Sequence, residues 1–406
     1  MTTFTQYLSG SQTKVTNPRG YQTTTHYQTF DAPGYDTPVS LTEPGGVTTT
    51  ITRDVYGKPT AITRSGYWNS TYQSLTRHLV YDTYQRLCKR VDPESGATVM
   101  DYDAAGNLAW TARSTSLTSP SACQTASVPA YTKSLRSYDA RNRLINITHP
   151  TGTASESYAY YAKSALHTAS TSPGATWTYV WNKRGLPLSE TLSQSGRTFA
   201  IGYDYTSLGH VSTLTYPSGL SLSFAPNALG QPTKAGTYAS TATYHPNGSL
   251  TGFTYGNGLI HIRTLNARGL PYQIRDRKGS TSLLNYTYSY DANGNLTGLT
   301  DTTLPGPWTE SRNLAYDARD RMTLATAPGI FGEELYDYDV LDNVRRMAVY
   351  PNGSGGYVQD YRYQYSPTTQ HLTRIDEADG SPQWFFGHTA LVSCSISFDS
   401  YLQCSI

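Results

Sequence analysis

Apolar side chains in this chain alternate with polar ones over short stretches and do not recur at helical spacing. No segment sustains apolar residues at positions i, i+3, i+4 and i+7, the pattern of an amphipathic helix. Tyr and Thr, which favour strands, and Gly, which favours turns, are abundant, with 35 Tyr and 34 Gly in 406 residues. The pattern therefore predicts an all-β protein built from short antiparallel strands.

A seven-residue motif recurs along the chain and sets the length of the predicted repeat. Its clearest copies are YDAAGNL from Tyr102 and YDANGNL from Tyr290. With close and weaker variants, about fifteen copies begin at residues 30, 53, 81, 102, 138, 160, 181, 205, 226, 244, 265, 290, 316, 338 and 365. Their mean spacing is about 24 residues, and Pro/Gly turns lie between them, at Asp92, His149, Tyr216, Tyr255 and Tyr350. One unit is therefore a turn, a strand, a Pro/Gly turn and a second strand, with lengths typical of β-hairpins.

The motif has the composition of a three-residue hairpin loop, in which a type I turn is followed by a residue in the left-handed conformation. Gly106 and Gly294 take the left-handed position in the two clearest copies. In other copies Asn or Asp, which tolerate that conformation best after Gly, stands there, at Asn142, Asp320 and Asp342. Gln85 departs from the pattern, which argues against such a turn in the copy at Tyr81.

This loop would pair the first residue of the motif with the seventh across the hairpin. Tyr102 then lies opposite Leu108, and Tyr290 lies opposite Leu296. Aromatic–aliphatic pairs of this kind stabilise a sheet by about 0.2–1 kcal/mol each. The Tyr and Leu positions are therefore expected to support the hairpins.

The second residue of the motif would pair with the sixth. The pair carries opposite charges in three copies: Asp82 with Arg86, Asp139 with Arg143, and Asp317 with Arg321. The alternative role for each Asp is an Asx turn, in which the carboxylate accepts hydrogen bonds from the loop backbone. The residues on which the predicted repeat depends are Tyr81, Asp82, Tyr102, Asp103, Gly106, Leu108, Tyr138, Asp139, Tyr290, Asp291, Gly294, Leu296, Tyr316, Asp317, Tyr338 and Asp339.

Composition and charge exclude several other classes of protein. Leu, Ile, Val and Phe make up only about 17% of the chain, but a net charge of +2 and 12% aromatic residues argue against disorder. The sequence has no run of 18 apolar residues, and its first residues lack the apolar core of a signal peptide. Near-neutral charge argues against a nucleic-acid partner. We expect neither membrane insertion nor nucleic-acid binding.

Cysteine content and one interruption of the repeat complete the local picture. Four cysteines in 406 residues do not make a disulfide framework, although Cys394 and Cys404 could form a bridge. The Ser/Thr/Pro-rich segment 114–130 lengthens the interval between two copies of the motif. We expect it to be an exposed loop that proteases can cleave.

These Y-D-x-x-G-x-L units, about 24 residues apart with P-x-G turns between them, resemble the Rhs/YD-repeat family over about residues 21–384. The resemblance implies a long curved sheet of antiparallel hairpins that is part of a hollow β-shell. In Rhs polymorphic toxins and the C components of Tc toxins, the shell encloses a toxic C-terminal region. Teneurins, which act in cell adhesion, and wall-associated-type proteins have similar repeats.

The resemblance also divides the chain. Residues 1–29 would be a partial N-terminal repeat, residues 30–384 the repeat array, and residues 385–406 a non-repeat tail. Complete family members continue into a D-P-x-G-L stretch, whose Asp takes part in self-cleavage in many of them, and then into a toxin. The final run ALVSCSISFDSYLQCSI keeps no repeat frame, and we interpret it as a truncated or frameshifted tail. The run from Asp92 to Gly96 is similar to that stretch only superficially, since it stands at an ordinary Pro/Gly turn.

The sequence offers little that is typical of an enzyme or a cofactor site. It has no nucleophile elbow, no P-loop and no zinc-binding H-E-x-x-H, so we expect no enzyme, no cofactor and no metal. The run from Asp291 to Asn295 has the start of a calcium loop without its closing Glu, and turn formation explains it better. The Trp residues could form a sugar-binding face or could simply fill a sheet that is poor in Leu and Ile: Trp68, Trp110, Trp177, Trp181, Trp308 and Trp384.

The leading hypothesis is therefore a non-enzymatic segment of an Rhs-type shell. The resemblance implies an enclosed C-terminal toxin or effector as its partner, components of a secretion machine as further partners, and a bacterial protein that is secreted or held at the cell surface. One alternative is a cell-surface adhesive or carbohydrate-binding module that recognises glycans. Another is a vestigial fragment without independent function, because an incomplete sheet exposes edges that aggregate.

Overall fold

The computed structural model confirms the all-β class. It describes residues 2–29, 34–150, 152–162, 165–171, 174–303, 309–351, 358–385, 393–396 and 402–405. Within these residues, strands are interrupted only by turns, irregular stretches and two single-turn 3-10 helices, η1 (Thr125–Ser127) and η2 (Ala130–Thr132). The repeat copy at Phe30, the turns at His149 and Tyr350, and most of the predicted tail 385–406 lie wholly or partly outside the described residues.

The first sheet contains nineteen strands, and each pairs antiparallel with the next along the chain. They are β1 (Phe4–Leu8), β2 (Gln12–Thr16), β3 (Gln22–Tyr27), β4 (Pro38–Glu43), β5 (Val47–Arg53), β6 (Pro59–Trp68), β7 (Thr71–Tyr81), β8 (Leu87–Asp92), β9 (Gly96–Tyr102), β10 (Leu108–Thr115), β11 (Ser134–Tyr138), β12 (Leu144–Thr148), β13 (Glu156–Tyr160), β14 (Leu166–Thr171), β15 (Ala175–Trp181), β16 (Pro187–Gln194), β17 (Arg197–Tyr205), β18 (Val211–Thr215) and β19 (Ser221–Ser223).

The second sheet contains thirteen strands connected in the same way, and a separate hairpin follows it. They are β20 (Ala239–Tyr244), β21 (Leu250–Tyr255), β22 (Ile260–Leu265), β23 (Pro271–Lys278), β24 (Thr281–Tyr290), β25 (Leu296–Asp301), β26 (Arg312–Tyr316), β27 (Met322–Ala327), β28 (Gly332–Tyr338), β29 (Val344–Tyr350), β30 (Gln359–Tyr365), β31 (Leu372–Glu377) and β32 (Pro382–Phe385), with β33 (Ser393–Ile396) and β34 (Leu402–Ser405) in the hairpin.

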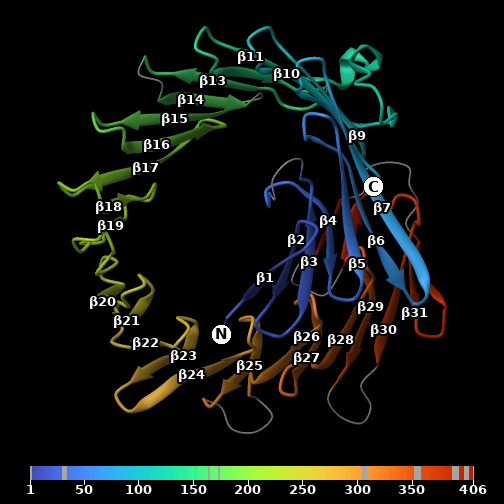
Figure 1. Cartoon of the computed structure of the whole chain (residues 1–406). Coiled ribbons are helices and arrows are strands. Elements are labelled where there is room, and N and C mark those ends of the chain that lie inside the picture. The colour runs from blue at the N-terminus through green and yellow to red at the C-terminus, as the bar shows by residue number, and fades with distance from the viewer. Residues whose placement is uncertain are drawn as a thin grey trace.

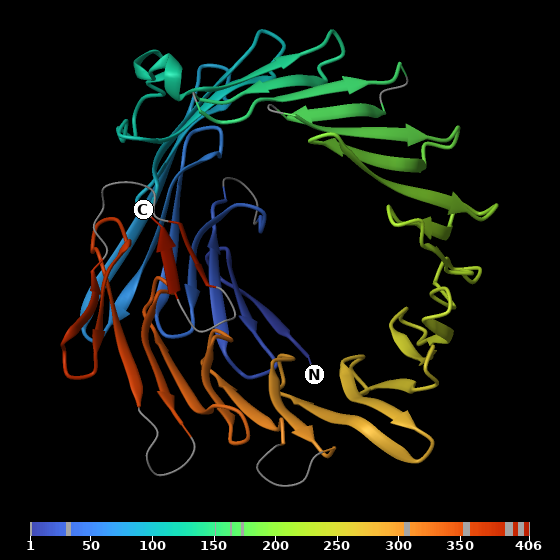
Figure 2. The ribbon, with the colours of Figure 1, turned by 180° about the vertical axis from the view of Figure 1, so that it is seen from behind.

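The two sheets follow one another around a wide arc (Figures 1 and 2). The blue N-terminal strands β1–β7 and the orange and red strands β25–β31 come together, so that the end of the arc returns to its beginning. Side-chain contacts between residues about 300 positions apart confirm that these strands meet, such as the ion pair between Arg19 and Asp320. The chain is thus a curved strip whose first and last parts lie side by side.

The seven-residue motif forms the hairpin loop that the sequence predicts. Gly106 and Gly294 have φ of 83° and 103°, and Asn142, Asp320 and Asp342 have φ of 59°, 62° and 71°. The prediction for Gln85 was wrong, because its φ of 64° puts the copy at Tyr81 in the same geometry. There the N–H of Asp82 donates to the carbonyl of Arg86 at 2.8 Å, and the N–H of Gln85 donates back to Asp82 at 2.9 Å. Hydrogen bonds within the loop therefore hold Gln in a conformation that it seldom adopts.

The first residue of the motif faces the seventh, as predicted. Tyr102 pairs with Leu108, and Tyr290 pairs with Leu296. The same register recurs elsewhere: Tyr81 with Leu87, Tyr138 with Leu144, Tyr316 with Met322, and Tyr338 with Val344. A β-bulge follows each pair, which increases the local twist of the strand and so helps the strip to curve.

The acidic residue of the motif fills both of the roles considered for it. Oδ1 of Asp139 accepts the backbone N–H groups of Arg141 and Arg143, at 2.8 and 3.0 Å. Oδ2 forms an ion pair with the guanidinium of Arg143 at 2.6 Å. The hydrogen bonds from Arg143 hold the pKa of this carboxyl at about 2. One oxygen therefore closes the loop, while the other binds the sixth residue of the motif.

The hydroxyl of the first Tyr makes a contact that the sequence analysis missed. It donates to the carbonyl of the seventh residue of the preceding copy, for example from Tyr102 to Leu87 at 2.8 Å and from Tyr138 to Leu108 at 3.0 Å. The contact recurs in further copies, from Tyr81 to Pro59, Tyr160 to Leu144, Tyr205 to Pro187, Tyr244 to Pro232, Tyr316 to Leu296, and Tyr338 to Met322. In the copy at Trp181 the indole N–H donates to Leu166 instead, at 2.8 Å. These nine copies are thus each tied to the copy before them.

Buried apolar side chains are few, and the largest group lies beside the insertion after β10. Val99, Trp110 and Ala112 pack there against Val128. The segment 114–130 is therefore not the fully exposed loop that the sequence predicts, since part of it folds back onto the sheet. Elsewhere the sheet depends mainly on hydrogen bonds along its strands and between its turns.

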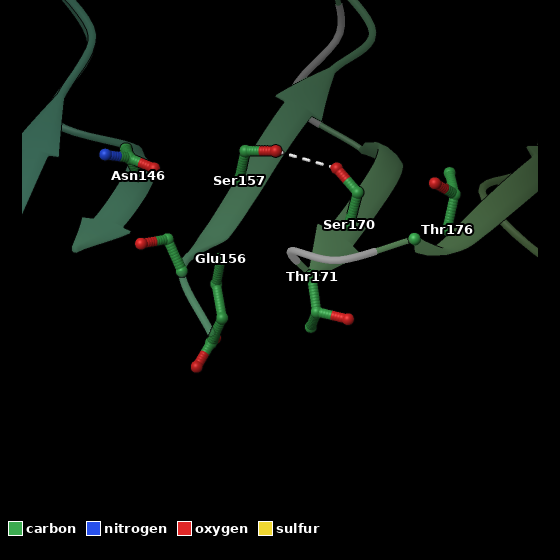
Figure 3. Close-up of a pocket in the computed structure, with 8 residues that line it drawn as sticks. Asn146, Glu156, Ser157, Ser170, Thr171 and Thr176 are labelled. Carbon is green, nitrogen blue, oxygen red and sulfur yellow. Dashed lines mark hydrogen bonds between the residues drawn. The ribbon is translucent and has the colours of Figure 1, made fainter. Parts of the chain in front are cut away.

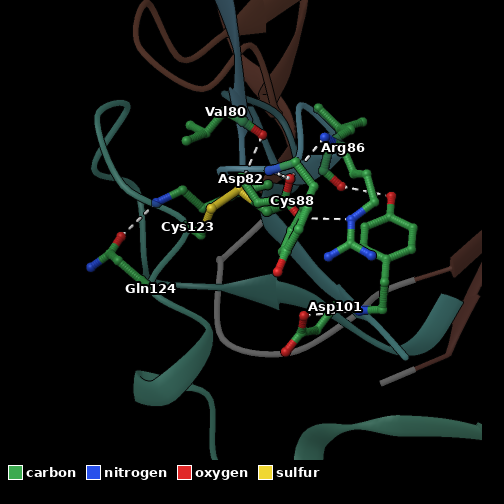
Figure 4. The surroundings of a disulfide bond; sticks show 11 residues. Val80, Asp82, Arg86, Cys88, Asp101, Cys123 and Gln124 are labelled. Carbon is green, nitrogen blue, oxygen red and sulfur yellow. Dashed lines mark hydrogen bonds and ion pairs between the residues drawn. A yellow bond between two sulfur atoms is a disulfide. The ribbon is translucent and has the colours of Figure 1, made fainter. Parts of the chain in front are cut away.

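The structure contains one disulfide that the sequence analysis missed. Cys88 and Cys123 form a disulfide, with Cα atoms 5.4 Å apart, which attaches the insertion to β8 (Figure 4). The sequence did not indicate this pair, because the two cysteines are 35 residues apart and only the folding back of the insertion brings them together. Cys394 and Cys404 face one another in the register of β33 and β34, but their side chains lie outside the described residues, so a bridge there stays a prediction.

Replacing Tyr138 by Phe tests the hydroxyl contact between copies. The change keeps the ring but removes the donor to Leu108, and we expect it to lower the free energy of unfolding by about 0.5–1.5 kcal/mol. Urea denaturation measures the change. Tyr56→Phe is the matched control, because the Tyr56 side chain is 68% exposed, and it should change stability by less than about 0.5 kcal/mol. Equal effects of the two substitutions would contradict the assignment.

Candidate functional site

In the described structure, the contacts between residues farthest apart in the sequence lie along the line where the first strands meet the last. Successive hairpins turn at alternate edges of a sheet, so the loops of the motif share one edge and the turns between them share the other. We call these the motif turns and the spacer turns. The spacer turns after β2, β4, β6 and β8 lie along the motif turns after β24, β26, β28 and β30 (Figures 1 and 2). We call this line the seam.

The seam begins at Arg19, in the spacer turn between β2 and β3. Its guanidinium donates to the backbone carbonyls of Tyr316 and Asp317, at 2.9 and 2.7 Å. It also forms ion pairs with Asp320 at 2.8 Å and with Asp291 at 3.3 Å. Burial opposes the charge of Arg19, but the hydrogen bond to Asp320 and the charge of Asp291 outweigh it and raise the pKa of Arg19. One side chain thus joins the first sheet to two motif turns of the second.

The turn that carries Arg19 has the geometry of a motif turn, which the sequence analysis missed. Asn17 stands in place of the Asp, and its side-chain oxygen accepts the N–H groups of Arg19 and Tyr21, each at 3.0 Å. Gly20 has φ of 89° at the left-handed position. Thr16 pairs with Gln22, as the first and seventh residues of the motif do. The run TNPRGYQ is therefore a copy of the motif without its Tyr and Asp.

Arg19 is the fourth residue of that copy, and arginines at the fourth position make the same contact between motif turns elsewhere. Each donates to a backbone carbonyl of the next motif turn: Arg141 to Ala162 at 2.6 Å, Arg184 to Ser207 at 3.0 Å, Arg268 to Asp291 at 2.7 Å, and Arg319 to Asp339 at 3.0 Å. The motif turn at Tyr290 has Asn293 at this position, and Arg19 supplies the guanidinium contact to the turn at Tyr316 instead. At Arg19 the seam therefore uses the contact that links neighbouring repeats.

The middle of the seam is centred on Asp342. Its carboxylate forms ion pairs with Arg64 of β6 at 3.0 Å, with Arg319 at 3.0 Å and with Arg321 at 2.9 Å. A cavity of about 480 Å³ lies here and is lined by Glu43, Arg64, Arg319, Arg321, Tyr338 and Asp342. Arg64 on one side of the seam and Arg319 and Arg321 on the other therefore bind the same carboxylate.

Close backbone approach accompanies these ion pairs. A Cβ atom at Gly66 would lie 3.1 Å from Cγ1 of Val340, and the Nε of Arg64 donates to the carbonyl of Val340 at 3.0 Å. A larger side chain at Gly66 would push the motif turn away from β6. The absence of a side chain at this position is thus what allows β6 and the turn to touch.

The far part of the seam contains an arginine between two aromatic rings. The guanidinium of Arg345 lies 5.0 Å from the ring centre of Trp68 and 4.8 Å from that of Tyr365. Its Nε donates to the buried carboxylate of Asp339 at 2.8 Å. Cation–π contacts strengthen when the cation is removed from water, as it is here. Beyond it, the ring of His371 contacts the backbone carbonyl of Glu94 in the spacer turn after β8.

The residues predicted from the sequence divide between the seam and the rest of the strip. Asp291, Tyr316, Asp317 and Asp339 contact Arg19 or Arg345 at the seam. Those of the first sheet build the repeat elsewhere: Tyr81, Asp82, Tyr102, Asp103, Gly106, Leu108, Tyr138 and Asp139. Sequence reasoning missed the seam because its partners are up to about 300 residues apart. A usable signal was present, since Arg recurs at the fourth position of the motif.

The structure also bears on the other candidate sites. Within the described ranges, no group of three His, Cys, Asp or Glu side chains is arranged to hold a metal ion. No helix in the described part of the chain is long and apolar enough to cross a membrane. Trp110 is buried against Val128, one face of the Trp68 ring is covered by Arg345, and Trp308 is outside the described residues.

A second cavity, of about 400 Å³, lies on the first sheet near the ends of β12–β15 (Figure 3). Its lining is polar apart from one glycine, and consists of Asn146, Ser155, Glu156, Ser157, Ser170, Thr171, Gly174 and Thr176. Ser157 and Ser170 face one another across two strands, with their hydroxyl oxygens 2.7 Å apart. The carboxylate of Glu156 binds the ring of His149 at 3.1 Å and the hydroxyl of Tyr158. Hydrogen bonds from Tyr158 and His149 hold the pKa of Glu156 below its usual range.

Comparison with known proteins finds the fold but no sequence relative. No protein-family model matches the chain, and no curated protein matches it. A crystal structure of TcdB2-TccC3 is similar, with a TM-score of 0.61 and 12% identity over 99% of this chain and 28% of that one. The structure of the Photorhabdus luminescens Tc holotoxin pore has a TM-score of 0.61 and 13% identity over 96% of this chain and 24% of that one. This chain therefore has the fold of Tc toxin chains, and spans about a quarter of their length.

Replacing Arg19 by Ala tests the seam. The change removes two hydrogen bonds to carbonyls and two ion pairs, so we expect a loss of about 1.5–3 kcal/mol in the free energy of unfolding. Hydrogen exchange should become faster in residues 17–21 and 316–321 together. Arg197→Ala, at an exposed position of β17, is the control and should leave both regions unchanged. Faster exchange in 17–21 alone would show that the two sheets are not joined at Arg19.

Proposed function

We propose that this chain is a non-enzymatic structural segment of a shell that encloses or displays a toxin or effector polypeptide. The observation that carries the proposal is the seam, because it joins the beginning of the strip to its end. The likeness to Tc toxin chains supports a place in such a shell. In this role the chain catalyses no reaction. It forms a wall that separates the enclosed polypeptide from its surroundings until delivery.

The contacts within the strip are consistent with a structural role as a wall. Neighbouring strands pair throughout each sheet, and their motif turns are tied by arginine and tyrosine contacts, so the strip needs little apolar core. Where repeat units mostly contact their neighbours, stability is approximately the sum of the units and of the contacts between neighbouring units. The ionic groups that cluster most densely, around Asp342 and Arg19, are engaged in holding the strip together.

A secreted or cell-surface location fits the same proposal. The disulfide between Cys88 and Cys123 belongs to the oxidising compartments in which such bonds persist. A toxin or effector would be the partner inside the wall, and components of a secretion machine would be partners during export. Both partners follow from the proposed role in a shell.

Enclosure is testable with a reporter polypeptide fused after Ile406. We expect the fused reporter to resist an added protease several-fold longer than the free reporter, because the curved wall shields it. The seam variant Arg19→Ala with Asp342→Asn should lose this protection while keeping its β-sheet signal in circular dichroism. Cleavage of the reporter at the free rate in the unmodified chain would contradict enclosure.

The polar cavity beside β12–β15 favours a second candidate function, the binding of a glycan. Asn146, Ser157, Ser170 and Thr176 stand in one row across β12–β15, and their amide and hydroxyl groups are of the kinds that recognise sugar hydroxyls. A glycan array should then give hits that Ser157→Ala with Ser170→Ala abolishes and that Ser74→Ala, an exposed serine of β7, retains. An array without hits, or hits that survive the double substitution, would remove this candidate.

A further inference from the structure

The insertion between β10 and β11 covers part of the outer face of the sheet. Its short helices η1 and η2 lie outside the arc in both views (Figures 1 and 2). Val128 of the insertion is 5% exposed and packs on Val99, Trp110 and Ala112. The ammonium group of Lys133 lies 3.9 Å from the ring centre of Trp110. We call residues 116–133 the cover.

One covalent bond holds the centre of the cover in place. The disulfide joins Cys123 of the cover to Cys88 of β8 (Figure 4). Val128 is the one fully buried side chain among the described residues of the cover, and most of its other side chains are small and polar. The cover is therefore attached to the sheet by a bond that a thiol can break and by little apolar surface.

A buried cation lies beneath the cover. The side chain of Lys89 is fully buried, and in the described structure its ammonium group has one hydrogen-bond partner, the side-chain oxygen of Gln124 in the cover, at 2.6 Å. No carboxylate in the described part of the chain forms an ion pair with Lys89. A buried ammonium group without an opposite charge favours any opening that readmits water. The disulfide thus holds closed a segment that the charge of Lys89 tends to open.

We propose that residues 116–133 are a thiol-controlled cover of the outer face. A dithiol reductant attacks Cys123, the more exposed sulfur, and displaces Cys88 as a thiolate, which then takes up a proton. The second thiol of the reductant resolves the mixed disulfide, so two electrons and two protons pass to the cysteines and the reductant becomes a cyclic disulfide. The cover then lifts about its ends at β10 and β11. This exposes Lys89 and the apolar strip of Val99, Trp110 and Ala112.

The cover would make one patch of the surface respond to thiols, a property that the proposed structural role does not require. The seam contacts are made at the edges of the strip, whereas Cys88 and Lys89 lie in β8 on the face beneath the cover. Reduction therefore changes one patch of the outer surface and leaves the seam intact. The proposal does not depend on what the shell encloses.

The test is limited proteolysis of the folded full chain before and after treatment with dithiothreitol, with the cuts mapped by mass spectrometry. We expect chymotrypsin to cleave after Leu117, which packs against the apolar cluster, at least about tenfold faster after reduction, because a disulfide usually contributes more than the about 1.4 kcal/mol that a factor of ten represents. Cleavage after Tyr84, which is exposed in a motif turn, should keep its rate. An amine-reactive reagent should label Lys89 several-fold faster, with exposed Lys183 unchanged.

A double variant isolates this bond from the other cysteines. Cys88→Ser with Cys123→Ser should show the fast cleavage and the labelling of Lys89 without any reductant. If alkylation confirms free thiols but cleavage and labelling stay at the oxidised level, the disulfide is not what holds the cover. If reduction accelerates cleavage everywhere and the β-sheet signal is lost, the bond supports the whole fold and the proposal also fails.

Discussion

The fold depends on a side-chain oxygen that recurs in most copies of the motif and closes the loop by accepting backbone N–H groups. In the copy at Tyr138 this oxygen belongs to Asp139, and in the copy that carries Arg19 it belongs to Asn17. A sheet with so little apolar core cannot set its register by packing, so the loop has to set it. Once the loop is closed, the first and seventh residues are opposite each other, and the Tyr and Arg side chains of neighbouring copies come within reach of each other's carbonyls.

The sequence allowed those features to be predicted that depend on a few neighbouring residues. The hairpin loop, the left-handed position of Gly106 and the pairing of Tyr102 with Leu108 follow from local chemistry. Gln85 shows the limit of residue preference, because loop hydrogen bonds impose a conformation that Gln rarely takes. The Tyr hydroxyl contact needed the arrangement of two successive hairpins, although 35 Tyr against nine Phe was a signal that the hydroxyl matters.

Features that join distant parts of the chain could not be predicted in this way. Arg19 meets Asp320 only because the strip curves through a full return, and that curvature is the sum of small twists at many bulges. The disulfide of Cys88 depends likewise on the path of the insertion. In both cases the residue types are ordinary, and geometry alone makes them partners. The candidate site was therefore the part of the molecule that the sequence predicted least well. The residue type that builds it, an Arg at the fourth position of a turn, was nevertheless visible in the sequence.

Apart from Arg19, the arginine and tyrosine contacts between neighbouring copies concern the motif turns and the strand ends beside them. The spacer turns vary in length, from two residues between β6 and β7 to eighteen between β10 and β11. In mechanical terms the strip has one stiff edge and one compliant edge. In such a strip, the strand ends at the compliant edge separate more easily than those at the stiff edge. Along the seam, the compliant edge of the first strands lies against the stiff edge of the last strands. The seam therefore supports the strip at the edge that bends most easily.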